Sequence, residues 1–206
     1  MRASGIVIVL AIALAAGTAK AGPLAGAPLA EALRGGGYVL LMRHASSPPT
    51  PPGPKEADPG NPGRERQLDA AGKRTAAAMG QAIRALRLPI GEVWSSPTYR
   101  ALQTVRLAGL PSPRTAPELG DRGRSMQAVG TDQGAWLRAR VATSPKAGTD
   151  TVIVTHQPNI SAAYGSAGAG LADGEALVFR PRGQAQPETV ARIRIDDWPK
   201  LAAAGR

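Results

Sequence analysis

The chain has only two histidines, His44 and His156, and each lies at the end of a short, mostly apolar run. His44 ends the stretch YVLLMRH, in which Arg43 precedes it, and His156 ends the stretch TVIVTH. Arg100 comes soon after a third run, EVWSSP. Guanidinium groups match the oxygens of a phosphoryl group in bidentate fashion and stay charged at any working pH. A neutral imidazole can attack phosphorus, and a second one can donate hydrogen bonds to oxygens that gain charge in the transition state. These four residues could therefore perform phosphoryl transfer, with arginines instead of a metal ion supplying the positive charge.

The surrounding sequence predicts strands that alternate with helices. Short apolar or alternating runs predict strands over 38–42, 92–95, 151–155, 176–179 and 190–195. Helical spacing or a proline in a first turn predicts helices over 69–88, 97–107, 133–142, 158–164 and 199–204, with Ser96 as the N-cap of the second. The proline-rich stretch 46–63 is expected to be an extended loop. This alternation is typical of an α/β three-layer sandwich, with a mostly parallel central sheet flanked by helices.

An open α/β sheet binds ligands beyond the carboxyl ends of its strands, and both histidines fall at such ends. Taken singly, each residue has an ordinary structural interpretation. A histidine at a strand end is often a hydrogen-bonded structural residue, and an arginine on a helix is usually solvated. The shared edge of the predicted sheet favours a common pocket for Arg43, His44, Arg100 and His156.

The first 21 of the 206 residues have the parts of a secretory signal peptide. Arg2 is the charged start, residues 6–16 are apolar, and Ala19-Lys20-Ala21 is a small-x-small cleavage site. The alternative is an uncleaved membrane anchor, but a spanning helix needs about 20 apolar residues. We therefore expect cleavage near Ala21, export to the periplasm, a single domain over 22–206, and no stable membrane insertion after cleavage.

Composition narrows the possible partners and chemistry. The formal net charge is +10, or +8 without Arg2 and Lys20. Aromatic residues make up only 3% of the chain, too few for the stacking platforms of nucleic-acid binding, so we expect the charge to attract small anionic substrates. The absence of cysteine excludes disulfides, cysteine chemistry and thiolate metal sites.

Four blocks in order resemble the histidine phosphatase superfamily, which has the phosphoglycerate-mutase-like fold. They are LLMRHASS, RERQLDAAGKRTAAAMGQAIRAL, WSSPTYRALQTVRLAG and VIVTHQPNISA, and the stretch GEALVFRPRG is similar to a strand of the acid-phosphatase branch. The resemblance implies that His44 is the nucleophile and becomes phosphohistidine, which water then hydrolyses. Arg43, Arg100 and His156 would complete the phosphate pocket, without a metal or other cofactor, and Arg66 or Gln67 would lie near its entrance.

One position departs from this pattern. In the acid-phosphatase branch an aspartate follows the second histidine and protonates the leaving oxygen, but here that residue is Gln157, which cannot do so. The mutase branch uses an upstream glutamate, for which Glu118 or Asp121 could substitute. Glu175 is a third candidate, although a strand-end glutamate can equally serve as a backbone hydrogen-bonding partner. A fourth possibility is that no dedicated acid exists, as in the small phosphohistidine phosphatases.

The sequence thus predicts an exported, metal-independent phosphomonoesterase that forms a phosphohistidine on His44. A phosphosugar, including heptose phosphates of the lipopolysaccharide core, or another small phosphate ester would be the substrate, and a phosphoprotein is a second possibility. A mutase and a phytase are disfavoured, because the mature chain is short and has no large inserted cap. Two alternatives of other classes are a non-catalytic protein that binds phosphate ligands in the retained pocket and a structural envelope protein.

Overall fold

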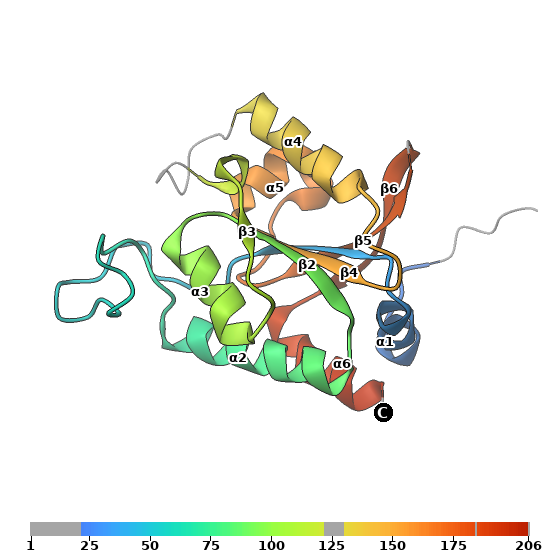
Figure 1. The fold of residues 1–206 in the computed structure, drawn as a ribbon, viewed down its shortest axis with the longest axis horizontal. Coiled ribbons are helices and arrows are strands. Elements are labelled where there is room, and N and C mark those ends of the chain that lie inside the picture. Colours follow the sequence, from blue (N-terminus) through green and yellow to red (C-terminus); the bar gives the residue numbers. More distant parts are fainter. Residues whose placement is uncertain (1–21, 122–129, 184, 206) are drawn as a thin grey trace, which may run out of the picture.

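The computed structural model describes residues 22–121, 130–183 and 185–205, and it contains a six-stranded sheet (Figure 1). Its strands are β1 (Val39–Arg43), β2 (Ile90–Ser95), β3 (Arg114–Thr115), β4 (Asp150–Thr155), β5 (Ala176–Arg182) and β6 (Ala185–Ile193). The order across the sheet is β3-β2-β4-β1-β5-β6. The strands from β3 to β1 pair in parallel, whereas β5 pairs antiparallel with both β1 and β6.

The prediction of a mostly parallel sheet is therefore wrong, because the sheet is mixed. Only two residues separate β5 from β6, and so short a link permits a hairpin but not the helical crossover that parallel strands require. The parallel part holds the three strands whose carboxyl ends carry the predicted site. The expected gathering of residues at that edge does not depend on β5 and β6.

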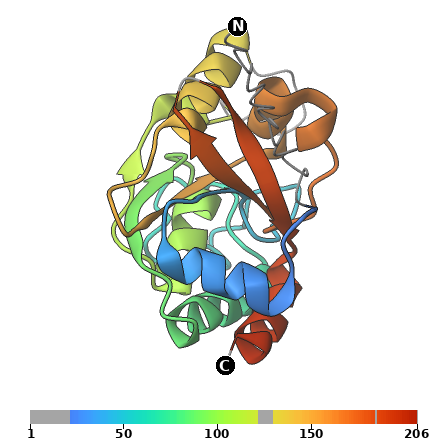
Figure 2. The same cartoon turned by 90° about the vertical axis from the view of Figure 1, so that its right-hand side faces the viewer.

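Helices cover both faces of the sheet. They are α1 (Gly26–Gly35), α2 (Ala70–Ala85), α3 (Tyr99–Ala108), α4 (Thr131–Ala142), α5 (Gln157–Tyr164) and α6 (Trp198–Ala204), with 3₁₀ turns η1 (Pro117–Leu119), η2 (Gly165–Gly168) and η3 (Ile195–Asp197). Helices α4 and α5 pack together on one face, and α1, α2, α3 and α6 lie on the other (Figures 1 and 2). All five predicted helices are present, whereas α1 and the two-residue β3 were not predicted.

The central strands are buried on both faces, as their apolar runs predict. In β1, Leu40 and Met42 join the hydrophobic core beneath α1, α2, α3 and α6. Val39 and Leu41 join the second core, beneath α4 and α5. Every residue of β4 is buried. The rigid sheet centre thus ends abruptly at His44 and His156, where polar side chains begin.

Local contacts fix the helices that border this edge. The Asp69 carboxylate caps α2 by accepting a hydrogen bond from the Gly72 amide at 2.7 Å. Helix α3 packs closely on α2, since a Cβ on Gly80 would lie 1.8 Å from the Ala108 carbonyl oxygen. This α3 begins at Tyr99, two residues later than predicted, and its first amide donates to the Glu65 carboxylate at 2.8 Å.

The predicted loop 46–63 is irregular, as expected, and it is bonded to the helices beside it. The Asp58 carboxylate accepts hydrogen bonds from Lys73 of α2 and from Tyr99 and Gln103 of α3. Gln67 is 8% exposed and binds this loop through the Asp58 amide and the Glu56 carbonyl, so it supports the loop instead of lining an entrance. These bonds connect the part of the loop around Glu56 and Asp58 to α2 and α3.

Candidate active site

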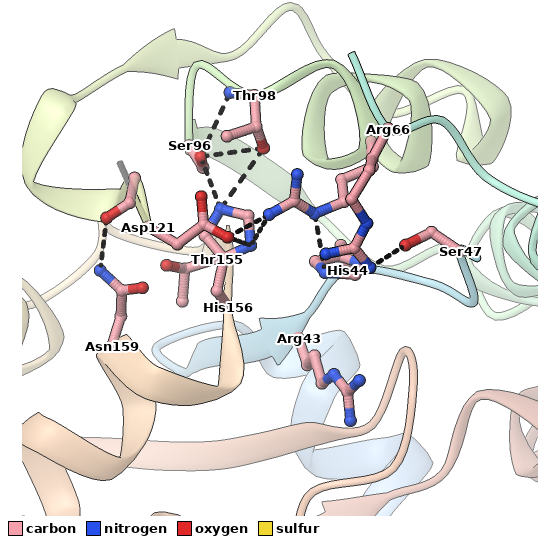
Figure 3. A network of polar contacts seen from close by, with 12 residues as sticks. Arg43, His44, Ser47, Arg66, Ser96, Thr98, Asp121, Thr155, His156 and Asn159 are labelled. Atoms are coloured by element: carbon pink, nitrogen blue, oxygen red, sulfur yellow. Dashed lines mark hydrogen bonds and ion pairs between the residues drawn. The ribbon is translucent and has the colours of Figure 1, made fainter. Parts of the chain in front are cut away.

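The structure brings both histidines together at the carboxyl ends of β1 and β4 (Figure 3). Arg100, which follows the carboxyl end of β2, joins them. The two imidazole centroids are 5.2 Å apart and the ring planes meet at 65°. Arg100, in the first turn of α3, lies between them. Its Nε is 3.1 Å from His44 Nε2, and its Nη2 is 3.1 Å from His156 Nδ1. All three side chains are almost completely buried.

The surroundings of His44 select one tautomer of its imidazole. Nδ1 lies 2.8 Å from the carbonyl oxygen of Ala45, which can only accept, so Nδ1 carries the hydrogen. Nε2 therefore keeps its lone pair, which accepts the hydrogen bond from Arg100. Burial lowers the pKa of His44 well below its ordinary value, and the nearby His156, Arg100 and Arg43 lower it further, against the hydrogen bond to Ala45. The result is a neutral imidazole whose unprotonated Nε2 is the potential nucleophile.

Hydroxyl groups orient the second histidine. His156 Nε2 is 2.9 Å from Ser96 Oγ and 3.3 Å from Thr98 Oγ1. Ser96 is thus not the predicted N-cap of α3; Thr98 occupies that position, without a side-chain capping bond. Burial, followed by the charges of Arg100, Arg66 and Arg43, lowers the pKa of His156 well below its ordinary value. Ser96 and Thr98 were not predicted as site residues, and only their position after β2 signals this role.

The three arginines around the imidazoles differ in their contacts. Arg66, which the sequence places near the entrance, donates to Ser47 Oγ at 2.9 Å and to the Pro48 carbonyl at 2.8 Å, beside His44 (Figure 3). Arg43 donates to the Leu171 carbonyl at 2.9 Å and forms an ion pair with Asp173 at 2.6 Å. Its guanidinium is separate from the hydrogen-bonded network that joins the imidazoles, although its charge lowers the pKa of both. Arg100 is therefore the predicted arginine that contacts the histidines, and Arg43 lies at the rim.

Asp121 is the candidate proton donor that contacts the imidazole network. Its side chain is 1% exposed and forms an ion pair with Arg100, and its Oδ2 lies 3.8 Å from His156 Nδ1. Glu175 instead accepts from Arg192 Nε and from the Ala172 amide, both at 2.9 Å, which matches its alternative interpretation as a backbone partner. Glu118 is half-buried, and its described hydrogen bonds are made by its carbonyl oxygen.

Gln157, which stands where an aspartate was expected, has structural contacts. Its Nε2 donates to the Gly168 carbonyl at 2.7 Å, and its Oε1 accepts from the Leu171 amide at 2.9 Å. The carboxamide thus holds the segment that follows η2. It uses both a donor and an acceptor, which an aspartate at this position could not do.

The described residues show neither a metal-binding cluster nor a membrane-spanning helix. Among residues 22–121, 130–183 and 185–205, no group of three or more histidine, aspartate or glutamate side chains is arranged to hold a metal ion. Over the same ranges, every helix is too short or too polar to cross a membrane.

Comparison with solved structures identifies the fold. The protein histidine phosphatase SixA, in a complex with tungstate, matches with a TM-score of 0.56 and 17% identity over 78% of this chain and 98% of its own. Two proposed SixA phosphohistidine phosphatases each match with a TM-score of 0.52. The protein from Agrobacterium tumefaciens is 17% identical, over 76% of this chain and 97% of its own. That from Nakamurella multipartitia is 24% identical, over 76% and 95%.

This chain has the SixA fold. At these identities the likeness to SixA concerns the arrangement of the backbone, and it matches the fold that the sequence resemblance predicts. No protein-family model matches the chain, and no curated protein matches it either.

Proposed function

We propose that the protein is an exported, metal-independent phosphomonoesterase that acts through a phosphohistidine on His44. The observation that carries this proposal is the Nε2 atom of His44, which carries no proton and accepts a hydrogen bond from the Arg100 guanidinium at 3.1 Å. A phosphoryl group that binds Arg100 would take over this donor and leave the Nε2 lone pair available for attack. A nucleophile beside a fixed positive charge is the arrangement that attack on a phosphoryl group requires. The fold shared with SixA and a phosphatase-like order of sequence blocks support the same assignment.

The reaction would proceed in two displacements. Nε2 of His44 forms a bond to phosphorus while the bond from phosphorus to the ester oxygen breaks. The ester oxygen takes a proton from an acid of the pocket and leaves as the alcohol, and that acid is reprotonated by the water that attacks in the second step. Arg43, Arg66, Arg100 and His156 stabilise the charge on the other phosphoryl oxygens. Water then attacks the phosphohistidine, giving inorganic phosphate and restoring the neutral imidazole. Asp121 would give up its ion pair with Arg100, so that the guanidinium binds the phosphate during both steps.

A small phosphate ester such as a phosphosugar is the proposed substrate class, because the nucleophile His44 is only 5% exposed. SixA, as a protein histidine phosphatase, makes a phosphoprotein the second candidate. Export to the periplasm follows from the signal-like residues 1–21, and it disfavours a cytoplasmic phosphoprotein. Fractionation with mass measurement of the mature chain tests export: a chain that begins at Gly22 supports it, and an uncleaved cytoplasmic chain overturns it.

The activity is tested with p-nitrophenyl phosphate, using residues 22–206 with a chelator present, alongside His44→Ala. We expect turnover that survives the chelator and falls by at least about 1,000-fold in the variant, because the nucleophile is lost. Tungstate binding by the variant reports that the pocket is still folded. Equal turnover in both proteins would exclude His44 as the nucleophile. Tight tungstate binding without turnover in the native protein would favour the phosphate-binding alternative, which the replacement of the expected acid by Gln157 motivates.

A further inference from the structure

A second carboxylate, Asp173, lies at the rim of the pocket on the turn before β5. The side chains of its ion pair with Arg43 are partly exposed, 29% for Arg43 and 37% for Asp173, although the pairing oxygen Oδ1 is buried and lacks hydrogen-bond geometry within the described residues. The other carboxylate of the pocket, Asp121, is 1% exposed beneath Arg100. Burial lowers the pKa of Arg66, and the charges of Asp121 and Asp173 both oppose that shift. Asp173 is therefore close enough to act electrostatically on a second arginine of the pocket as well as on Arg43.

The turn that carries Asp173 is fixed by backbone hydrogen bonds. The Leu171 amide donates to Gln157, the Ala172 amide donates to Glu175, and the Gly174 amide donates to the carbonyl oxygen of His44 itself at 2.9 Å. Gly174 has a φ of +71°, and a Cβ there would lie 2.3 Å from the Ile195 side chain, so this position accepts only glycine. Three of the four residues in the turn are thus held by their amides, with Asp173 directed at Arg43 from a rigid support.

The fixed turn gives Gln157, the residue that follows the second histidine, a structural role. Gln157 cannot donate a proton to a leaving group, but its carboxamide holds Leu171, whose carbonyl oxygen in turn accepts from Arg43. Gln157, Leu171, Arg43 and Asp173 form one connected group at the rim. A carboxylate is therefore present in this part of the pocket, although it comes from a different segment of the chain.

The direction of the reaction distinguishes the two aspartates. In phosphoryl transfer the attacking and leaving atoms lie roughly in line on opposite sides of phosphorus. His44 is 5% exposed and attacks from the floor of the pocket, so the leaving oxygen departs towards solvent. Asp121 lies at the level of the floor, beside Arg100 and His156. Asp173, at 37% side-chain exposure, is the more exposed of these two carboxylates.

We propose that Asp173 is the proton donor to the leaving oxygen, a proposal that rests on the phosphohistidine mechanism above. An arriving phosphate ester replaces Asp173 at the Arg43 guanidinium. A guanidinium binds phosphate oxygens strongly through two parallel hydrogen bonds, whereas an ion pair between partly exposed side chains contributes little to stability. The phosphate charge beside the released carboxylate favours its protonated form. As the bond to the ester oxygen breaks, the carboxyl group gives its proton to that oxygen and the alcohol leaves. The carboxylate then takes a proton from the water that attacks phosphohistidine, which restores the acid.

The proposal is tested by the dependence of kcat/KM on the leaving group in Asp173→Asn. A general acid matters most for esters whose alcohol leaves poorly, so we expect a loss of about 100- to 10,000-fold for phenyl and alkyl phosphates. For p-nitrophenyl phosphate, whose leaving group needs little protonation, we expect a loss of less than about tenfold. Asp173→Glu should recover part of the alkyl phosphate activity. Asp197→Asn, which breaks an exposed pair with Lys200 at the start of α6, is the matched control and should leave all rates unchanged.

Other outcomes overturn the assignment. An equal loss on every ester in Asp173→Asn would mean that Asp173 only positions Arg43. If tungstate binds Asp173→Asn more tightly while all rates stay unchanged, Asp173 only competes with anionic ligands for Arg43. The selective loss appearing in Asp121→Asn instead would make Asp121 the donor. These results all presuppose native turnover that depends on His44, so failure of the proposed function is seen separately, in the native protein and in His44→Ala.

Discussion

At the scale of single residues, the site keeps its two imidazoles neutral next to three guanidinium groups. Burial is the largest cause of the lowered pKa of both histidines, and the arginine charges act in the same direction. Neutrality matters differently for each ring. His44 needs the free lone pair on Nε2 to attack, whereas His156 can take up a proton once a phosphate brings negative charge into the pocket.

A titration of the two imidazoles by nitrogen NMR tests this arrangement in the ligand-free protein. Both rings should stay neutral as the pH falls through 6.5, the ordinary midpoint, and His44 should show the tautomer with hydrogen on Nδ1. The folded pKa values lie below the unfolded ones, so their contribution to stability is present above pH 6.5 and is lost as the pH falls further. The urea-unfolded chain is the control and should titrate near 6.5. A folded-state midpoint at 6.5 for either ring would contradict the structure.

At the scale of elements, the sequence predicts which segments form the edge of the sheet but not every contact there. The runs before His44 and His156 predict β1 and β4 because both faces of these strands are buried. Helix α1 lacks a clear start, since its N-cap Ala25 offers no side-chain bond, and β3 has only two residues, so neither leaves a pattern to find.

Some contacts in the site are equally invisible in the sequence. The pairing of Arg43 with Asp173 joins residues 130 positions apart, and a turn of small residues gives no sign of the partner its aspartate meets. Ser96 contacts His156 because the chain turns between β2 and α3. The proline after Ser96 indicates that a helix starts there, but it does not indicate where the Ser96 side chain points. Residue type and position after a strand thus predict the centre of the site, whereas its rim depends on tertiary contacts.

Asp150, the first residue of β4, gives this element a pH-dependent stability. It is fully buried, and one carboxylate oxygen accepts from the Tyr38 amide at 2.9 Å. No hydrogen-bond donor for the other oxygen is found among the described residues. Burial raises the pKa of Asp150 to about 7, against the hydrogen bond from Tyr38. Because the folded pKa is higher than the unfolded value of 3.8, the folded state loses stability as the pH rises from about 4 through 7.

Asp150→Asn should remove this dependence while keeping the oxygen that accepts from Tyr38. Relative to the native protein, the free energy of unfolding of the variant should rise by about 2–4 kcal/mol between pH 4 and pH 8, since each pKa unit corresponds to about 1.4 kcal/mol. Urea unfolding at several pH values measures the difference. Asp132→Asn, on the exposed first turn of α4, is the control and should show no such trend. A constant difference between Asp150→Asn and the native protein across this range would show that the carboxyl group is not protonated on folding.

At the scale of the whole molecule, the site gathers side chains from separate parts of the chain, next to strands that the sheet already pairs. Its residues come from β1, the segment before α2, the start of α3 and the end of β4, and the chain has no disulfide to link them. An oxyanion bound by Arg100, Arg66 and His156 would bridge these segments. Ligand binding at the edge of the sheet should therefore stabilise the molecule as a whole, in addition to ordering the pocket.

Thermal unfolding of residues 22–206 with tungstate, the anion bound in the SixA structure, measures this coupling. A ligand at about 100 times its Kd adds about 2.7 kcal/mol, which for a chain of this size raises Tm by about 5–10 °C. Arg100→Ala removes the guanidinium between the imidazoles and should abolish most of the shift. Arg182→Ala, an exposed arginine that pairs with Glu188 on the β5–β6 hairpin, should keep it, which separates binding in the pocket from a general effect of anions on a basic protein. An equal shift in both variants would place the anion outside the pocket, because Arg100 lies between the two imidazoles of the pocket.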